Sequence, residues 1–211
     1  MAAIRNIIFD LGNVLVSFDW QIAYQRLAQH VSPMTALLLW ARKEEFLREV
    51  RGDQELMETG RMTAEQFYVR IKGKIGLTLD YPQFETIWCD IFTANAEVLA
   101  LARMLGKNYS CYIFSNTNAV HMKHLRTRVP ELALFKGMAL SHELGVMKPA
   151  REFFELALRA LELEAAESVF VDDLAENVAG ARECGIDSIQ YQSCPHLVQE
   201  LAARGVACSA S

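Results

Sequence analysis

Short apolar runs that end at polar residues recur along the chain. The first covers residues 7–9 and ends at Asp10, a second ends at Ser115, and another ends at Asp172. Runs of this length, rich in β-branched and aromatic residues and bounded by turn-forming residues, are typical of buried strands. The pattern predicts five strands, at residues 7–9, 112–115, 137–141, 169–171 and 188–191.

Residues 18–95 carry a different pattern, between the first and the second predicted strand. Apolar residues recur there at helical spacing, among them Phe67, Ile71 and Ile75. Ser32 before a proline indicates one helix start, and Thr63 with Gln66 three residues later indicates a capping box at another. No strand pattern interrupts the segment, so we expect an all-helical insertion.

From residue 96 onward, helix and strand patterns alternate. The predicted helices cover residues 98–105, 119–126, 153–161, 177–184 and 196–204. This alternation predicts βαβ units, and therefore a parallel sheet with helices on both faces and right-handed crossovers. The 211 residues, 52% apolar and 22% charged, suit one α/β domain or a core domain with a smaller insertion.

Composition argues against several classes of function. No apolar run approaches the roughly 18 residues that a membrane span requires, and the first residues lack the pattern of a signal peptide. We therefore expect a cytoplasmic protein with no membrane partner. The net charge of -5 provides no basic field for nucleic acid, and the five cysteines include no Cys-x-x-Cys pair that would indicate a zinc site.

Polar residues at the ends of the predicted strands are the first candidates for chemistry. In doubly wound sheets, ligands bind beyond the carboxyl ends of the strands, which is where Asp10, Ser115 and the Asp172-Asp173 pair stand. Lys148 precedes a proline and a predicted helix, and it is the candidate cation for a phosphorylated ligand. Each of these residues also has an ordinary structural alternative. Asp10 could be a turn residue or a helix N-cap, the Asp172-Asp173 pair could form a solvated turn, and Lys148 could lie in an exposed loop.

Four of these segments, taken in order, resemble the motifs of a known superfamily. They are Phe9-Asp10-Leu11-Gly12-Asn13-Val14, Ser115-Asn116-Thr117-Asn118, Lys148-Pro149, and Asp172-Asp173 with Asn177. They resemble the haloacid dehalogenase superfamily of aspartate-nucleophile phosphohydrolases, over nearly the whole chain. They are most similar to its bacterial sugar-phosphatase branch, which includes the α-D-glucose-1-phosphate phosphatases.

The resemblance implies an architecture. It implies a Rossmann-like, doubly wound parallel sheet with strand order 5-4-1-2-3, formed by residues 1–17 and 96–211. Residues 18–95 would form a helical cap that lies over the active site and chooses the substrate.

The resemblance also implies a Mg²⁺-dependent reaction and a role for each motif residue. Asp10 would attack the phosphoryl group and form an aspartyl-phosphate, which water then hydrolyses. Asp10, the Gly12 carbonyl and Asp173 would hold Mg²⁺, with Asp172 acting through a bound water. The phosphate would be bound by Lys148, Ser115 and the backbone amides of Asn116 and Thr117. Asn177 would hold the Asp172-Asp173 loop or Lys148 in place, and an ordinary early-helix asparagine is an equal alternative.

The chain departs from the superfamily's pattern at Gly12. The phosphatases usually carry a second aspartate there, two residues after the nucleophile, which acts as general acid and then as base. Asp19 is one substitute, although a helix N-cap is its more ordinary role. A sugar 1-phosphate would reduce the need for a proton donor, because an anomeric oxygen is a better leaving group than an ordinary alcohol.

Other aromatic and histidine residues are expected to have structural roles. Trp20, Trp40 and Trp88 lie in helical stretches of the insertion, where they fit its core better than a sugar-stacking platform. His121 and His124 share a predicted helix face, but the further ligands of a metal site are not evident.

The sequence is compatible with three functions. The preferred one is a Mg²⁺-dependent phosphoric monoester hydrolase that acts on a small phosphorylated metabolite, a sugar phosphate. A haloacid dehalogenase shares the aspartate nucleophile but needs no metal, so the pair Asp172-Asp173 argues against it. A non-catalytic phosphate-binding protein that lost turnover through Gly12 is the third. Neither the substrate nor the oligomeric state is predicted.

Overall fold

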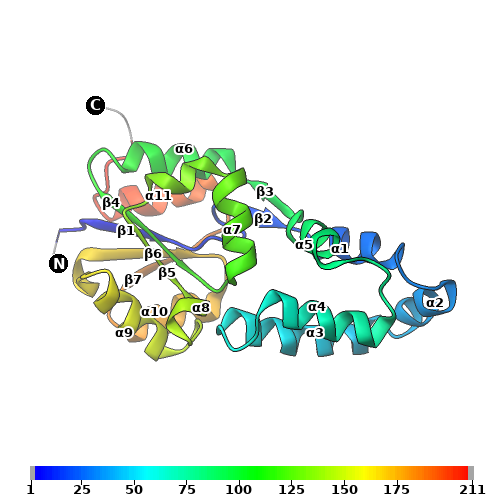
Figure 1. The fold of residues 1–211 in the computed structure, drawn as a ribbon. Helices are drawn as coiled ribbons and strands as arrows, with labels where there is room; N and C mark the ends of the chain where they lie inside the picture. The colour runs from blue at the N-terminus through cyan, green and yellow to red at the C-terminus, as the bar shows by residue number, and fades with distance from the viewer. Residues whose placement is uncertain (1–2, 209–211) are drawn as a thin grey trace.

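The core of the molecule is a five-stranded parallel sheet. The structure is a computed structural model that describes residues 3–208, without the side chains at positions 43–45, 47 and 49. The strands lie in the spatial order β5 (Gly137–Leu140), β4 (Ser110–Ser115), β1 (Asn6–Phe9), β6 (Ser168–Asp172) and β7 (Asp187–Gln190) (Figure 1). Counted along the chain without the short ribbon described below, this is the predicted order 5-4-1-2-3.

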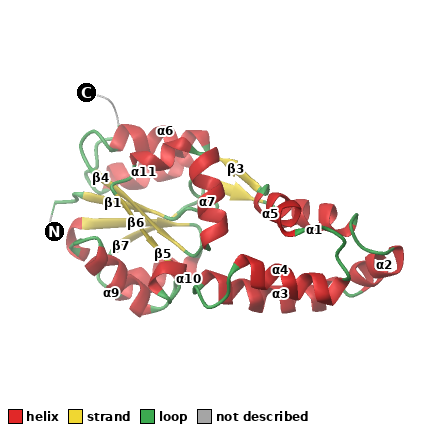
Figure 2. Cartoon of the chain, viewed as in Figure 1, coloured by secondary structure: helices red, strands yellow, loops and turns green. Residues whose placement is uncertain are grey.

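Helices cover both faces of this sheet (Figure 2). One face is covered by α6 (Ala96–Leu105), α7 (Ala119–Arg128) and α11 (Cys194–Ala203), and the other by α8 (Ser141–Leu144), α9 (Arg151–Ala160) and α10 (Ala175–Glu183). Two 3-10 turns, η1 (Pro130–Leu134) and η2 (Ala165–Glu167), complete the connections. The ends of the elements differ from the predicted ones by at most two residues.

Alternation along β1 divides the core into two layers. Ile7 and Phe9 pack into an apolar cluster with α6, α7 and α11, whereas Ile8 packs on the opposite face with Phe114 and Phe170. Successive side chains of a strand point to opposite faces, so a strand buried on both faces reads as a continuous apolar run. This explains why the run before Asp10 is apolar at every position.

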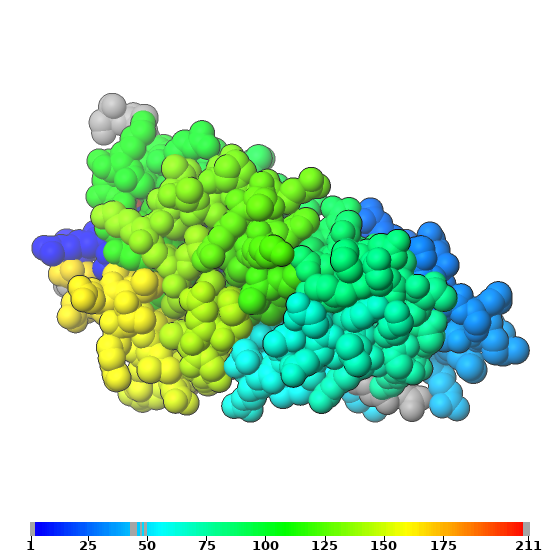
Figure 3. All heavy atoms as spheres, in the orientation of Figure 1, coloured from blue at the N-terminus to red at the C-terminus, as the bar shows by residue number. Residues whose placement is uncertain are grey.

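Five helices form a second body beside the sheet. They are α1 (Trp20–Ala28), α2 (Pro33–Ala41), α3 (Lys43–Glu58), α4 (Ala64–Ile75) and α5 (Tyr81–Cys89). Ser32 caps α2, and Thr63 and Gln66 form the predicted capping box at α4. These helices enclose their own apolar cluster, in which the ring centroids of Phe67 and Trp88 lie 4.8 Å apart. Figure 3 shows the cyan atoms of this body lying against the yellow-green atoms of the core.

A two-stranded ribbon, which the sequence pattern did not predict, joins the two bodies. β2 (Val16–Phe18) pairs antiparallel with β3 (Phe92–Ala94), with Phe18 opposite Phe92. The insertion is therefore not entirely helical, because its base is this ribbon. Each strand has three residues, which is too few for an alternation of apolar and polar positions to be recognised.

The tryptophan prediction is correct for two residues and wrong for the third. Trp88 is buried and its ring lies 5.0 Å from that of the partly buried Trp20, whereas Trp40 is 80% exposed on α2. Met34, Leu37 and Leu38 of the same helix are also more than half exposed. Because α2 is apolar around most of its circumference, its pattern does not indicate which face is buried.

None of the helices among residues 3–208 combines the length and the apolar character needed to cross a bilayer.

Candidate active site

Three adjacent strands bring the predicted polar residues to one edge of the sheet. Asp10 follows β1 directly, while Ser115 is the last residue of β4 and Asp172 the last of β6. β1 lies between β4 and β6, and all three run parallel, so their carboxyl ends meet. The structure therefore brings together side chains that are more than 50 residues apart in sequence.

Lys148 lies at the centre of this group. Its Nζ is 2.8 Å from Asp10 Oδ1 and 2.6 Å from Asp172 Oδ2, and it donates to the Phe114 carbonyl at 3.0 Å. The residue is 3% exposed, so the alternative of an exposed loop lysine is wrong. Burial disfavours the ammonium ion, but the two carboxylates raise the pKa of Lys148 above its usual value and keep it charged.

Asn116 fixes the backbone that carries Lys148. The Asn116 side chain donates to the Lys148 carbonyl at 2.8 Å and accepts from the Lys148 amide at 2.8 Å. This two-way contact joins the loop after β4 to the loop before α9. Sequence reasoning placed Asn116 among the phosphate-binding residues through its backbone, and it missed the role of its side chain.

Both carboxylate oxygens of Asp172 accept hydrogen bonds. Asn177 donates to both of its carboxylate oxygens at 3.0 Å, and the Leu174 amide donates to Oδ1 at 2.9 Å. Asp172 has no exposed surface, and its contact with Lys148 completes its set of partners. Of the two alternatives for Asn177, the structure shows the one in which it holds the Asp172-Asp173 loop.

Three carboxylates of this edge can share a cation. Oxygens of Asp10, Asp172 and Asp173 all lie within 4.8 Å of one another. Burial raises the pKa of Asp10 to about 7 despite the opposing charge of Lys148, and burial also raises the pKa of Asp173. Crowded acidic oxygens of this kind are hard ligands, and a divalent cation would neutralise them. The donor set therefore fits Mg²⁺.

The structure places the predicted phosphate-binding residues 115–117 at the end of β4, but it engages one of the two predicted amides elsewhere. Ser115 is buried at the end of β4, as expected. However, the Thr117 amide donates to Ser141 Oγ at 2.9 Å, and Ser141 Oγ donates back to the Thr117 carbonyl at 3.1 Å. The Thr117 amide is already used by the core, since Ser141 arrives from α8, a contact that the sequence does not reveal. Ser115 and the Asn116 amide remain the candidates.

Asp19 is not placed to transfer a proton. It caps α1, with Oδ1 accepting from the Gln21 amide at 2.8 Å, and it is exposed. The N-cap alternative is therefore confirmed. At Gly12, a Cβ would lie 3.0 Å from the Phe18 ring, so Phe18 faces the position where the superfamily's phosphatases usually carry their second aspartate.

A cavity of about 240 Å³ lies between this edge and the helical body. Core residues Gly12 and Ser115 line one side, and the other side carries Arg51, Gln54, Glu55 and Glu58 of α3. These four residues were missed because the packing of α3 on the core cannot be placed from sequence. Their spacing of three, four and seven residues from Arg51 marks one polar helix face, which is the signal that could have found them.

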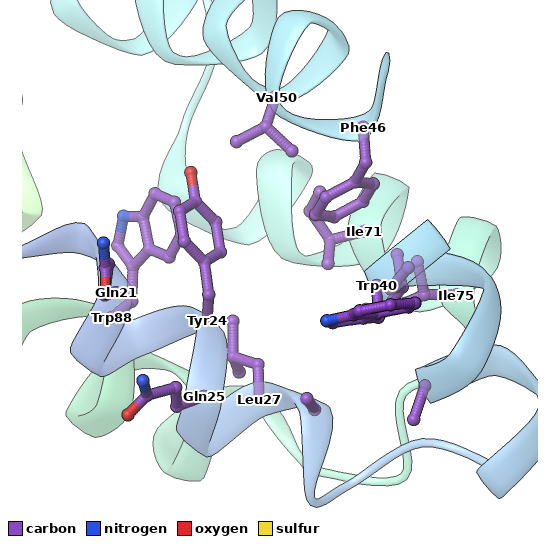
Figure 4. Close-up of a pocket in the computed structure, with 13 residues that line it drawn as sticks. Gln21, Tyr24, Gln25, Leu27, Trp40, Phe46, Val50, Ile71, Ile75 and Trp88 are labelled. Atoms are coloured by element: carbon purple, nitrogen blue, oxygen red, sulfur yellow. The ribbon is translucent and has the colours of Figure 1, made fainter. Parts of the chain in front are cut away.

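A second cavity, of about 270 Å³, lies within the helical body. Figure 4 shows Tyr24 and Trp88 at one end and Phe46, Ile71 and Trp40 at the other. Among the side chains that the structure describes, those that line it include no aspartate, glutamate, lysine or arginine. A phosphate has no charged partner among them, which favours the first cavity over this one for phosphoryl chemistry.

Comparisons with known proteins agree with this geometry. A model of the haloacid dehalogenase-like hydrolase family matches residues 4–185, which include Asp10, Lys148 and Asp173. A D-ribitol-5-phosphate phosphatase of Bacteroides thetaiotaomicron is 27% identical over 208 residues, which cover 94% of this chain and 97% of the relative. A sesquiterpene phosphatase of Aspergillus oryzae is 29% identical over 203 residues, covering 92% and 90%.

Solved structures share the fold. A haloacid dehalogenase family enzyme of Bacteroides thetaiotaomicron, in complex with magnesium and inorganic phosphate, aligns with a TM-score of 0.77. The two sequences are 24% identical, and the alignment covers 92% of this chain and 99% of that one. The sheet and the helical body described above are thus found together in another protein.

Proposed function

Because the chain belongs to the haloacid dehalogenase-like hydrolase family, we propose that it is a Mg²⁺-dependent phosphomonoesterase for a small phosphorylated metabolite, in particular a sugar phosphate. One observation carries the proposal: a buried lysine lies between two aspartates, 2.8 Å from Asp10 and 2.6 Å from Asp172, with Asp173 close by. In this proposal residues 18–95 act as the cap, and residues 1–17 and 96–211 form the catalytic core.

Asp10 is the proposed nucleophile. Its Oδ1 accepts from Lys148 Nζ and from the Leu11 amide at 2.7 Å, which fixes the carboxylate and leaves Oδ2 to attack phosphorus. The attack forms an oxygen–phosphorus bond to Asp10 and breaks the ester bond in line with it. Water then hydrolyses the aspartyl-phosphate and returns the Asp10 carboxylate.

The supporting residues stabilise the charge that the reaction moves. Lys148 and the hydroxyl of Ser115 bind the phosphoryl oxygens, and the Asn116 amide adds a third donor. Asp10, the Gly12 carbonyl and Asp173 would hold Mg²⁺, while Asp172 orients Lys148. When bound, Mg²⁺ neutralises the carboxylates and the phosphoryl oxygens.

The size and the polar lining of the cavity support a substrate whose leaving group is small and carries hydroxyl groups. Its volume is about 240 Å³, and α3 presents a guanidinium, an amide and two carboxyls to it. The relative named D-ribitol-5-phosphate phosphatase supports a polyol phosphate or a sugar phosphate as the substrate. The glucose-1-phosphate branch itself stays a prediction. A haloacid dehalogenase is disfavoured, since its reaction gives the acidic cluster around Asp173 nothing to bind.

Phosphate release from a panel of sugar and polyol phosphates tests the proposal. Wild type, Asp10→Asn and the matched control Asp19→Asn are compared with and without Mg²⁺. We expect release that needs Mg²⁺, falls by about 10⁵-fold or more in Asp10→Asn, and is unchanged within a few fold in Asp19→Asn. Equal activity of wild type and Asp10→Asn would contradict Asp10 as the nucleophile. No release from any compound would contradict a phosphatase and favour the non-catalytic phosphate-binding alternative.

A further inference from the structure

The reaction leaves one proton without an assigned donor. When the ester bond breaks, the electron pair goes to the leaving oxygen, and an alkoxide needs a proton to leave. Gly12 has no side chain, and Phe18 occupies the space beside it. Asp19 is engaged as the N-cap of α1. At the core edge, Asp172 has all its partners, and Asp173 is a proposed ligand of Mg²⁺, so neither of these carboxyls is assigned to the proton.

Glu58 faces the same cavity from the opposite side. It is the last residue of α3, it is partly buried, and it lines the cavity together with Gly12, Ser115 and Asn116. It lies close enough to Lys148 for the lysine's charge to act on its carboxyl. Glu58 is therefore placed on the cap side of the cavity, where the part of the substrate beyond the phosphate must lie.

A close backbone contact holds Glu58 over the core. Gly60, two residues further along, has a positive φ of 68°, and a Cβ on it would lie 2.4 Å from the His142 carbonyl oxygen. Only glycine permits this approach. The end of α3 thus rests directly on α8 of the core, and Glu58 is fixed between this contact and the cavity.

The surroundings of Glu58 allow both of its protonation states near neutral pH. Burial raises the pKa of Glu58 to about 7, the charge of Glu55 acts in the same direction, and Lys148 opposes it. Among the other groups that line the cavity, Arg51 is cationic, while burial lowers the pKa of His121 and keeps it neutral. Burial also lowers the pKa of His142, whose carbonyl lies against Gly60. A carboxyl of this kind can give a proton in one step and take one in the next.

We propose that Glu58, supplied by the cap, is the general acid and base of this hydrolase. The inference rests on the proposed phosphatase function and extends it. As Asp10 attacks phosphorus, the Glu58 carboxyl gives its proton to the leaving oxygen, and the alcohol departs. The Glu58 carboxylate then takes a proton from the water that attacks the aspartyl-phosphate, so that phosphate is released and both carboxyl groups return to their starting states.

Leaving-group dependence tests this role. We compare kcat/KM for an alkyl phosphate, ribitol 5-phosphate, and for 4-nitrophenyl phosphate, whose leaving group departs without a proton. The variant is Glu58→Gln, and the matched control is Asp53→Asn, a carboxyl of the same helix that pairs with Arg70 rather than lining this cavity. Because kcat/KM reports the steps up to ester cleavage, it isolates the acid role from the later base role.

We expect Glu58→Gln to lower kcat/KM for the alkyl phosphate by about 10² to 10³-fold, and for 4-nitrophenyl phosphate by less than about fivefold. Its kcat for 4-nitrophenyl phosphate should fall, with a burst of nitrophenol as the aspartyl-phosphate accumulates. In wild type, kcat/KM for the alkyl phosphate should also decline as the pH rises through the pKa of Glu58, because the carboxyl loses its proton. The pH profile of Glu58→Gln should lack this decline.

Two results would overturn the assignment. Equal losses of kcat/KM on both esters would make Glu58 a binding or structural residue, and an unchanged kcat/KM on the alkyl phosphate would give it no role in cleavage. The nearly unchanged kcat/KM of Glu58→Gln for 4-nitrophenyl phosphate serves as the control that the variant is folded. A wild-type protein that hydrolyses neither these two esters nor any compound of the sugar and polyol phosphate panel would overturn the proposed function and this inference together. Either of the two results above would leave the phosphatase standing.

Discussion

The two sides of the active-site cavity are built differently. On the core side, Lys148, Asp10, Asp172 and Asn177 form one buried network of ion pairs and hydrogen bonds, in which the Oδ1 of Asn177 is an acceptor without a partner among the described residues. On the cap side, the polar face of α3 lines the cavity, and the buried Nε2 of Gln54 has no hydrogen-bond partner among the side chains that the structure describes.

This difference indicates which part of the site is already oriented before a ligand binds. A catalytic network works best when its groups are already oriented, because no energy is then spent on reorganising them during the reaction. An unpartnered buried donor has an unmade hydrogen bond that a ligand can supply. The core side therefore fits the constant phosphoryl group, and the cap side fits the variable remainder of the substrate.

Removing Lys148 should disrupt the buried network of the core side and give the largest loss of activity of the three variants. Lys148→Met leaves Asp10 and Asp172 facing each other without a cation, so we expect activity to fall by at least about 10³-fold and the free energy of unfolding in EDTA by about 3–5 kcal/mol. Urea unfolding measures the second effect. The control is Lys123→Met, which removes an exposed ion pair with Glu85 and should change stability by less than about 1 kcal/mol. Similar unfolding of both variants would show that the network contributes no stability.

Asp173→Asn should weaken metal binding while leaving the network of Lys148 in place. We expect the Mg²⁺ concentration for half-maximal activity to rise by about 10 to 100-fold, because one anionic ligand becomes neutral. Activity and calorimetric titrations with Mg²⁺ measure this change, and EDTA should abolish phosphate release from wild type. Asp187→Asn, at an exposed salt bridge with Arg204, is the control. An unchanged Mg²⁺ requirement would place the ion elsewhere.

Gly60→Ala should disturb the cap side alone and give the smallest effect. The added Cβ would meet the His142 carbonyl and move the end of α3 away from the core, so we expect about a tenfold lower kcat/KM. Gly76→Ala is the matched control, since Gly76 also has a positive φ but no atom near its Cβ position. Both variants should lose about 1–2 kcal/mol from backbone strain, but only Gly60→Ala should lose activity. Equal kinetics would show that the contact does not position the cap.

Most of the core side could be predicted from the sequence. A buried strand that ends in a polar residue has a local signature, so Asp10, Ser115 and Asp172 were found from the runs that precede them. Lys148 was found because it stands before a proline and a helix. The order of the strands came from resemblance, since periodicity does not encode which strands are neighbours.

The remainder depends on contacts between distant residues. Ser141 reaches the Thr117 amide across 24 residues, and Asn116 reaches Lys148 across 32. Glu58 and Lys148 come from different bodies of the molecule. A helix face indicates that it is polar but not what it faces, so α3 could be recognised as amphipathic without any indication that it covers Ser115.

The β2–β3 ribbon has a consequence for protein engineering. Phe18 and Phe92 are paired across it, so the two ends of the intervening segment lie about 5 Å apart. Insertions are best tolerated where the entry and exit of the chain are this close. A cap from another hydrolase, of any length, could be grafted between these two positions without moving Asp10. If the segment between the two strands selects the substrate, as proposed above, exchanging it at the ribbon should change substrate preference and leave the residues around Asp10 in place.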